Sequence, residues 1–218
     1  MQTIAALLFF CTLLLRPAWA QNSLTIYAES CFSGMTPQGV YPLVVTVRNQ
    51  GPSVDGAILV RSETFTDTSR RLLYPISLPT GTIKRILAYP VLEPYTSKVT
   101  VSFVGPARAR PHELLIASRG EGAYVGLIGD QIGGLAMLRP FQTERPSPPN
   151  MPPGTSMEQG MPFSDCYARP EDAPDRAAGY QGLRTLVLSE GAERMTSAQW
   201  AAIRQWVIGG GSLVLLGG

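Results

Sequence analysis

The stretch PLVVTVRNQGPSVDGAILVRSET, residues 42–64, shows how the first half of the chain folds. Every second residue from Leu43 to Val47 is apolar, whereas the alternate positions become polar towards Arg48. This alternation is typical of a half-buried β-strand, because successive side chains of a strand point to opposite faces of the sheet. The turn-forming residues 49–52 come next, and a second apolar run follows them. The stretch therefore predicts two strands joined by a turn.

The same pattern continues on both sides of this stretch. Turn residues separate six short apolar or alternating runs: Leu24–Ala28, Tyr41–Asn49, Gly56–Thr64, Arg71–Leu78, Thr82–Val91 and Lys98–Val104. Short strands at this spacing, without a sustained helical period, favour an antiparallel sandwich. We therefore predict a β-sandwich domain over residues 21–105.

Five tyrosines are scattered through this predicted sandwich: Tyr27, Tyr41, Tyr74, Tyr89 and Tyr95. A tyrosine has an apolar ring with a polar end, so it suits the edge of a packed core. The same side chain suits contact with a glycan or a protein partner when it is exposed. Packing at the sandwich edge is the simpler interpretation.

The second half of the chain contains four apolar runs of strand length: His112–Ala117, Tyr124–Ile128, Leu183–Ser189 and Ser212–Leu216. A helix is predicted between the last two runs. Thr196 and Gln199 fit a capping box at its start, and Gly209–Gly211 suits its end, because glycine adopts the left-handed conformation that ends helices.

Three apolar residues of this helix, Trp200, Ile203 and Val207, recur at the spacing of one helical face. Strand, helix and strand in this order predict a parallel sheet with a right-handed crossover. We therefore predict an α/β domain with a three-layer parallel sheet over residues 106–218.

A proline-rich segment interrupts this α/β domain at residues 140–175. It holds nine of the nineteen prolines and few aliphatic residues, so it has little apolar surface to bury. We expect a flexible surface insertion here. The alternative is a partner motif, because SPPNMPP, residues 147–153, suits a polyproline II helix.

The chain from Gly179 to Val214 resembles the class I glutamine amidotransferase-like domain, a flavodoxin-like fold. Gly179-Tyr180, Leu186-Val187-Leu188, Trp206-Val207 and Gly210-Gly211-Ser212-Leu213-Val214 carry the resemblance, and Pro174-Asp175-Arg176 suits it. Exported bacterial proteins carry such a domain behind an immunoglobulin-like module, which the strand Leu43–Val47 with its following turn also resembles.

The resemblance implies a catalytic cysteine at a strand-to-helix elbow, followed by a histidine and a glutamate. Here Cys166 lies in the proline-rich segment, and the sole histidine, His112, starts a predicted strand. Nothing in the sequence brings the two within the hydrogen-bond reach that nucleophilic catalysis needs. The resemblance therefore implies a domain that keeps the fold and lacks the catalytic residues, and we expect no catalytic residue in this chain.

The first twenty residues resemble a cleaved export signal. Residues 4–15 are almost wholly apolar but too short to span a bilayer, and Ala18-Trp19-Ala20 before Gln21 is a small-x-small cleavage pattern. The alternatives are an uncleaved signal anchor or a wrongly chosen start codon. We expect the protein to be periplasmic, extracellular or anchored in a membrane.

The composition excludes several kinds of partner and cofactor. Eighteen basic against sixteen acidic residues give no field strong enough for nucleic acid. One histidine and three cysteines do not supply an ordinary zinc site. We expect no cofactor and no metal. Export would permit a disulfide between Cys31 and Cys166, but two separate thiols are the simpler interpretation.

Ligand-site candidates come from the end of a predicted strand. Gly129 and Asp130 follow Tyr124–Ile128, and Glu190 follows Leu183–Ser189. Open α/β sheets bind ligands at the carboxyl ends of their strands. Asp130 suits a metal-facing carboxylate there, although a cap or turn is the commoner role for such a residue.

Three functions remain open at this point. The first is a non-catalytic envelope protein that binds or scaffolds an unknown envelope protein or a glycan. The second is a hydrolase or amidotransferase whose cysteine and histidine lie beyond residue 218. The third is an adhesin that binds a glycan or a protein through its sandwich. Four predicted strands are fewer than such sheets usually have, so we expect a fragment of a longer protein, with membrane association through a further segment.

Overall fold

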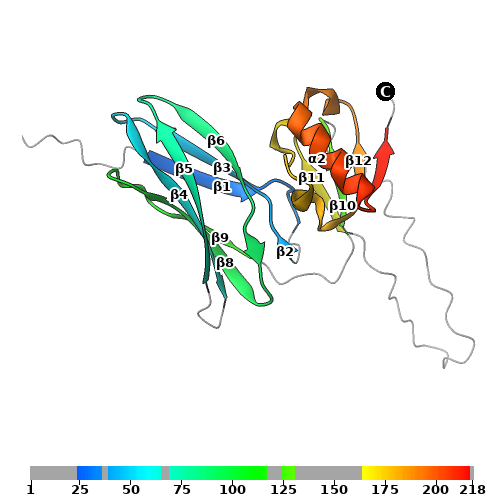
Figure 1. Ribbon diagram of the computed structural model, residues 1–218, viewed down its shortest axis with the longest axis horizontal. Coiled ribbons are helices and arrows are strands. Elements are labelled where there is room, and N and C mark those ends of the chain that lie inside the picture. The colour runs from blue at the N-terminus through cyan, green and yellow to red at the C-terminus, as the bar shows by residue number, and fades with distance from the viewer. Residues whose placement is uncertain (1–23, 36–38, 65–68, 117–123, 131–163, 217–218) are drawn as a thin grey trace, which may run out of the picture.

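The computed structural model describes residues 24–35, 39–64, 69–116, 124–130 and 164–216. These residues are mostly β-strand and form two parts (Figure 1). The antiparallel part contains β1 to β9, and the parallel part contains β10 to β13 with helix α2. The predicted export signal, residues 1–20, and residues 140–163 of the proline-rich segment lie outside the described residues.

Two antiparallel sheets make up most of the antiparallel part. One has the order β1-β3-β6, formed by Leu24–Ser30, Leu43–Asn49 and Ile83–Ala88. The other has the order β5-β4-β8-β9, formed by Ser69–Leu78, Val54–Thr64, Thr96–Val104 and His112–Leu115. The short strands β2 (Gly39–Val40) and β7 (Val91–Leu92) pair with each other. All six strand predictions in this region are confirmed.

A single hydrophobic core joins the two antiparallel sheets. Alternate residues of β3, Leu43, Val45 and Val47, pack in it together with Ile58 of β4 and Val101 of β8. The predicted turn after β3 is held by Asn49, whose buried side chain donates to the carbonyl oxygens of Pro52 at 2.8 Å and Leu78 at 2.9 Å. The alternation read from the sequence therefore identifies the inward face of β3.

The run His112–Ala117 was predicted to be the first strand of the parallel sheet, and this assignment is wrong. Residues 112–115 form β9, which pairs antiparallel with β8 and is an edge of the four-stranded sheet. Leu115 is exposed, and the burial alternates along the strand. Because β9 is the last strand in the order of this sheet, the antiparallel part extends past residue 105.

The parallel sheet has the order β11-β10-β12-β13, and all of its neighbouring strands run parallel. Its strands are Ser164–Ala168, Tyr124–Ile128, Leu183–Leu188 and Ser212–Leu215. The three of these strands that the sequence predicted are confirmed. Short 3₁₀ helices, η2 (Pro170–Asp172), η3 (Ala177–Tyr180) and η4 (Ala192–Arg194), occupy the connections.

Helix α2, Ser197–Ile208, has the predicted capping box: the Thr196 side chain accepts from the Gln199 amide, and Gln199 accepts from Thr196. Gly210 beyond its end has φ +104°, as expected for a glycine-ended helix. The predicted apolar face is confirmed at Ile203, which is buried, and at Val207, which packs against the core, but it is wrong at Trp200, which is exposed. Trp206 is buried in its place, and the buried Gln199 side chain donates to Pro170 and Ala173 from the same side of the helix.

The proline-rich segment is not wholly a surface insertion, since residues 164–175 form part of the packed structure. They contain β11 and η2, and they bury Cys166, Asp172 and Ala173. Cys166 therefore lies in a strand of the sheet and not in a loop. The segment was misread because β11, with the sequence SDCYA, has no apolar run that would mark it as a strand.

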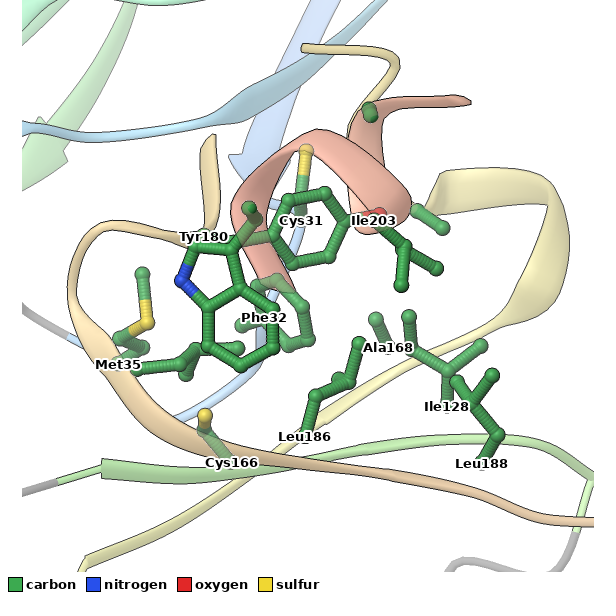
Figure 2. Close-up of a cluster of buried hydrophobic side chains, with 14 of the residues drawn as sticks. Cys31, Phe32, Met35, Ile128, Cys166, Ala168, Tyr180, Leu186, Leu188 and Ile203 are labelled. Atoms are coloured by element: carbon green, nitrogen blue, oxygen red, sulfur yellow. The ribbon is translucent and has the colours of Figure 1, made fainter. Parts of the chain in front are cut away.

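The core of the parallel part also contains residues of the antiparallel part (Figure 2). Cys31, Phe32 and Met35 follow β1 directly, yet they pack among Tyr180, Leu186 and Ile203. Phe32 and Tyr180 meet edge to face, with ring centroids 5.9 Å apart. In addition, Ser33 and Tyr167 exchange backbone hydrogen bonds of 2.7 and 3.2 Å. We call Cys31–Met35 the core-sharing segment.

Candidate functional site

The three predicted ligand-site residues meet at the carboxyl ends of β10 and β12. The Asp130 amide donates to the Glu190 carbonyl oxygen at 2.9 Å, and the Ser189 amide donates to Ile128 at 3.0 Å. Along the chain, β10 is the first strand of this sheet, β11 is the second and β12 is the third. In the sheet, however, β10 lies between β11 and β12. The point between β10 and β12 is therefore where the strand order reverses, which is where ligands bind in open α/β sheets.

Close backbone packing explains why glycines stand at this position. A Cβ on Gly129 would overlap the Ser189 hydroxyl and lie 2.9 Å from the Glu190 carbonyl oxygen. Gly191 has φ +91°, and the Asp130 carboxylate lies over it. Gly129 therefore serves the approach of two strand ends, which is a structural role at the candidate site.

The Asp130 carboxylate makes an ion pair with Arg194 of η4. Both side chains are about half exposed, so the pair contributes about 1 kcal/mol or less. Within the described residues, no three His, Cys, Asp or Glu side chains are grouped as a metal site would need. The ion pair gives the Asp130 carboxylate a partner at this turn.

The two described cysteines are core residues of the parallel part. Cys31 and Cys166 are both free and buried, and burial raises the pKa of each thiol far above its usual range. Both thiols therefore stay protonated at neutral pH. The nucleophilic form of a cysteine is the thiolate, so neither side chain is in its reactive form. His112 lies on β9, where its ring packs 5.0 Å from that of Tyr27. The structure thus places Cys166 and His112 on different sheets.

A group of charged side chains at the boundary between the two parts was not predicted. Asp172 of η2 is buried, and its two carboxylate oxygens accept from two arginines. Arg85 of β6 binds Oδ1, and Arg169 binds Oδ2 at 2.7 Å. Because a buried carboxylate needs partners, Asp172 ties a strand of the antiparallel part to the parallel part.

A second polar contact lies beside this one. The Tyr89 hydroxyl lies 2.5 Å from an Asp175 carboxylate oxygen and accepts from the Asp175 amide at 2.9 Å. The Arg176 guanidinium lies 5.2 Å from the centre of the Tyr89 ring. Burial, followed by the hydrogen bond to Asp175, raises the pKa of Tyr89. Its neutral hydroxyl is therefore the form that holds the two parts together.

The five tyrosines of the antiparallel part have different roles. Tyr41 and Tyr89 are buried, and the Tyr74 hydroxyl accepts from the Tyr89 amide at 2.9 Å. Tyr27 and Tyr95 are exposed, and Tyr95 has the unusual φ of +69°. Edge packing is thus the role of some tyrosines, while Tyr27 and Tyr95 are available to a ligand.

Sequence reasoning missed the contacts between the two parts for a simple reason. Hydrophobic periodicity reports which face of an element is buried, but it does not report which partner covers that face. The one signal was the motif Pro174-Asp175-Arg176, in which Asp175 and Arg176 contact Tyr89.

Among the described residues, no helix has the length and hydropathy needed to cross a membrane.

Residues 23–110 match the family model described as a domain of unknown function (DUF8726), which covers less than half of the chain. No curated protein matches the sequence. The matched residues correspond to most of the antiparallel part.

Three solved structures show limited similarity to the chain. The Northeast Structural Genomics Consortium target SoR45 is 13% identical, with a TM-score of 0.30, over 44% of this chain and 88% of that chain. The putative ApaA protein from Bordetella pertussis is 19% identical, with a TM-score of 0.27, over 43% of this chain and 88% of that chain. A GH2 beta-galacturonidase from Eisenbergiella tayi is 10% identical, with a TM-score of 0.32, over 85% of this chain and 43% of that chain.

Proposed function

We propose that the chain is a non-catalytic, exported protein of the cell envelope that binds or scaffolds another envelope component. In this proposal, the antiparallel part is an immunoglobulin-like β-sandwich. The parallel part is an amidotransferase-like domain without the catalytic residues, and its strand order 2-1-3-4 is that of the flavodoxin-like sheets. The export signal would be residues 1–20.

One observation carries the proposal: the core shared by the two parts. Cys31, Phe32 and Met35 lie in that core together with Cys166, so both described thiols are packing groups. Because they are buried and protonated, they are unsuited to nucleophilic attack. A shared core also holds the two parts in a fixed arrangement, and a fixed arrangement suits a protein that presents a surface to a partner.

The non-catalytic role is tested by the reactivity of the thiols. We expect a disulfide reagent such as Ellman's reagent to leave Cys31 and Cys166 unmodified in the native protein and to modify both in urea. Incubation with glutamine should release no ammonia above the blank. Rapid modification of Cys166 in the folded state, together with ammonia release that the Cys166→Ala substitution abolishes, would contradict the proposal.

The location is tested separately by mass spectrometry of the protein expressed in a bacterium. We expect the periplasmic or secreted fraction to contain a chain that begins at Gln21. Recovery of the full-length chain from the cytoplasm alone would contradict the export signal.

A further inference from the structure

An arc of five polar side chains crosses the boundary between the two parts, and each contacts the next. In order, they are Tyr27, Glu29, Arg169, Asp172 and Arg85, and we call them the boundary arc. The Tyr27 hydroxyl donates to Glu29 Oε2 at 3.3 Å, and an Arg169 nitrogen lies 3.5 Å from Glu29 Oε1. Asp172 then accepts from Arg169 and from Arg85. The arc therefore runs from β1 through the parallel part and back to β6.

The strand register brings the two ends of the arc to one sheet face. Tyr27 stands opposite Thr46 of β3, and Thr46 stands opposite Arg85 of β6. Residues directly opposite in an antiparallel pair point to the same face. The His112 ring packs against Tyr27 at an interplanar angle of 64° and supports it from β9. Tyr27 and Arg85, the two ends of the arc, thus lie on either side of Thr46 on one face of the three-stranded sheet.

The arc is accessible to solvent, and its two arginines share one buried partner. Tyr27 is 50% exposed, and the side chains of Arg85 and Arg169 are 40% and 56% exposed. Both guanidinium groups are anchored on the buried Asp172, so their orientation is set before a ligand arrives. Such preorganisation lowers the entropic cost of binding. Each guanidinium has five N–H donors, and the contacts with carboxylates use only part of them.

The charges of the arc balance. Within the arc, the two positive charges of Arg85 and Arg169 are matched by the two negative charges of Glu29 and Asp172. Glu171, outside the arc, lies 3.8 Å from Arg169 and adds no positive charge. A balanced set gives no long-range attraction for an anionic polymer. It does offer hydrogen-bond donors and acceptors side by side, next to an exposed aromatic ring. This combination fits a neutral ligand with many hydroxyl groups.

We propose that the boundary arc binds a neutral saccharide. The Tyr27 ring would lie against the C–H face of a sugar, Glu29 would accept from its hydroxyl groups, and Arg169 would donate to its oxygens. This inference rests on the proposed binding function, and it names the ligand class and the surface. Because the arc includes residues of both parts, it exists only when the parts are held together.

The test uses the full chain and a defined panel of sugars. The neutral probes are hexasaccharides of glucose, mannose, xylose and N-acetylglucosamine, and the charged probes are polygalacturonic acid and heparin. Binding is measured by isothermal titration calorimetry at low and high salt. We expect at least one neutral hexasaccharide to bind with little dependence on salt.

Three variants connect this binding to the arc. Tyr27→Ala should raise the dissociation constant by about tenfold or more. Tyr27→Phe keeps the ring, so its dissociation constant should stay within about threefold of that of the unsubstituted protein. Tyr95→Ala removes a tyrosine that is 75% exposed and is not part of the arc, and it should leave the affinity unchanged. Circular dichroism of each variant checks that it remains folded.

Three results would overturn the assignment of the arc. These are binding of none of the neutral hexasaccharides, binding of the charged polymers only, and neutral-sugar binding that Tyr27→Ala does not affect. If sugar binding fails while the thiols remain protected and the chain is exported, the arc assignment fails alone. Reactive thiols with ammonia release would instead contradict the proposed function.

Discussion

The Tyr89 hydroxyl lies 2.5 Å from a carboxylate oxygen of Asp175, and this contact links the end of β6 to the segment between η2 and η3. The two residues are 86 positions apart in the chain. The same hydroxyl accepts from the Asp175 amide, so one side chain satisfies both a carboxylate and a backbone donor of the other part. The boundary is therefore held by specific polar contacts as well as by the shared core.

Removal of this hydroxyl should destabilise the protein. Tyr89→Phe keeps the ring but leaves the Asp175 carboxylate and amide without this partner, so we expect a loss of about 1.5–3 kcal/mol in the free energy of unfolding. Urea unfolding measures the change. Tyr95→Phe is the matched control, because that tyrosine is exposed, and it should change the free energy by less than about 0.5 kcal/mol. Equal effects of the two substitutions would show that the Tyr89 contact adds nothing.

Stability should fall on the alkaline side of neutrality. The pKa values of Cys31, Cys166, Tyr89 and Tyr180 are all raised in the folded protein, mainly by burial. The unfolded-state pKa is about 8.5 for a thiol and about 10 for a tyrosine. Below it, the group is protonated in both the folded and the unfolded state, so its full contribution to the free energy of unfolding is present. Above it, only the unfolded state loses protons, so the free energy of unfolding falls as the pH rises.

Each such group should contribute a slope of up to about 1.4 kcal/mol per pH unit. Urea unfolding between pH 7 and pH 10.5 measures the slope, and it should steepen above about pH 9. Cys166→Ala removes one of the two buried thiols. The free energy of unfolding of this variant should therefore fall less steeply between pH 9 and pH 10. A free energy of unfolding that stays constant to pH 10.5 would be inconsistent with buried, protonated thiols.

Gln199 should be the most sensitive polar residue of α2. Its side-chain oxygen accepts from the Thr196 amide at 2.7 Å, and its nitrogen donates to the carbonyl oxygens of Pro170 at 3.1 Å and Ala173 at 2.7 Å. Gln199→Ala would break the capping box and leave buried carbonyl groups unpaired, with an expected loss of about 2–3 kcal/mol.

The same helix supplies the control for this substitution. Gln205 is exposed, so Gln205→Ala should change the free energy of unfolding by less than about 0.5 kcal/mol. Thermal unfolding followed by circular dichroism compares the two variants. A Gln199→Ala protein as stable as the Gln205→Ala protein would mean that the helix is held by its apolar face alone.

Much of the fold could be predicted from the sequence, because its signals are local. The alternation in β3 and the Thr196–Gln199 capping box each depend on neighbouring residues, and both appear in the structure. The rotation of α2 depends on the partners of Gln199, which are 26 and 29 residues away. Similarly, β9 was misassigned because an apolar run does not reveal which sheet it joins.

The candidate site divides in the same way. Gly129, Asp130 and Glu190 were expected together, because the carboxyl ends of neighbouring parallel strands meet. The boundary arc was not expected, because it joins Tyr27 to Arg85 through residues of another part of the chain. Its members have no shared motif, and only the docking of the two parts brings them together.

The shared core requires the two parts to unfold cooperatively. Phe32 is fully buried in the core of the parallel part, so Phe32→Ala should cost about 3–5 kcal/mol. In a chain without residues 1–20, both remaining tryptophans, Trp200 and Trp206, lie on α2, so fluorescence reports on the parallel part. Far-ultraviolet circular dichroism reports mainly on the strands, most of which belong to the antiparallel part.

The most direct test is urea unfolding of this chain followed by both signals. We predict that the fluorescence and circular dichroism transitions coincide, and that Phe32→Ala shifts both to lower urea by the same amount. Leu73→Ala, at an exposed position of β5, should leave both midpoints unchanged within about 0.2 M. Two separate transitions, with Phe32→Ala moving only the fluorescence one, would contradict the claim that the two parts form a single unit.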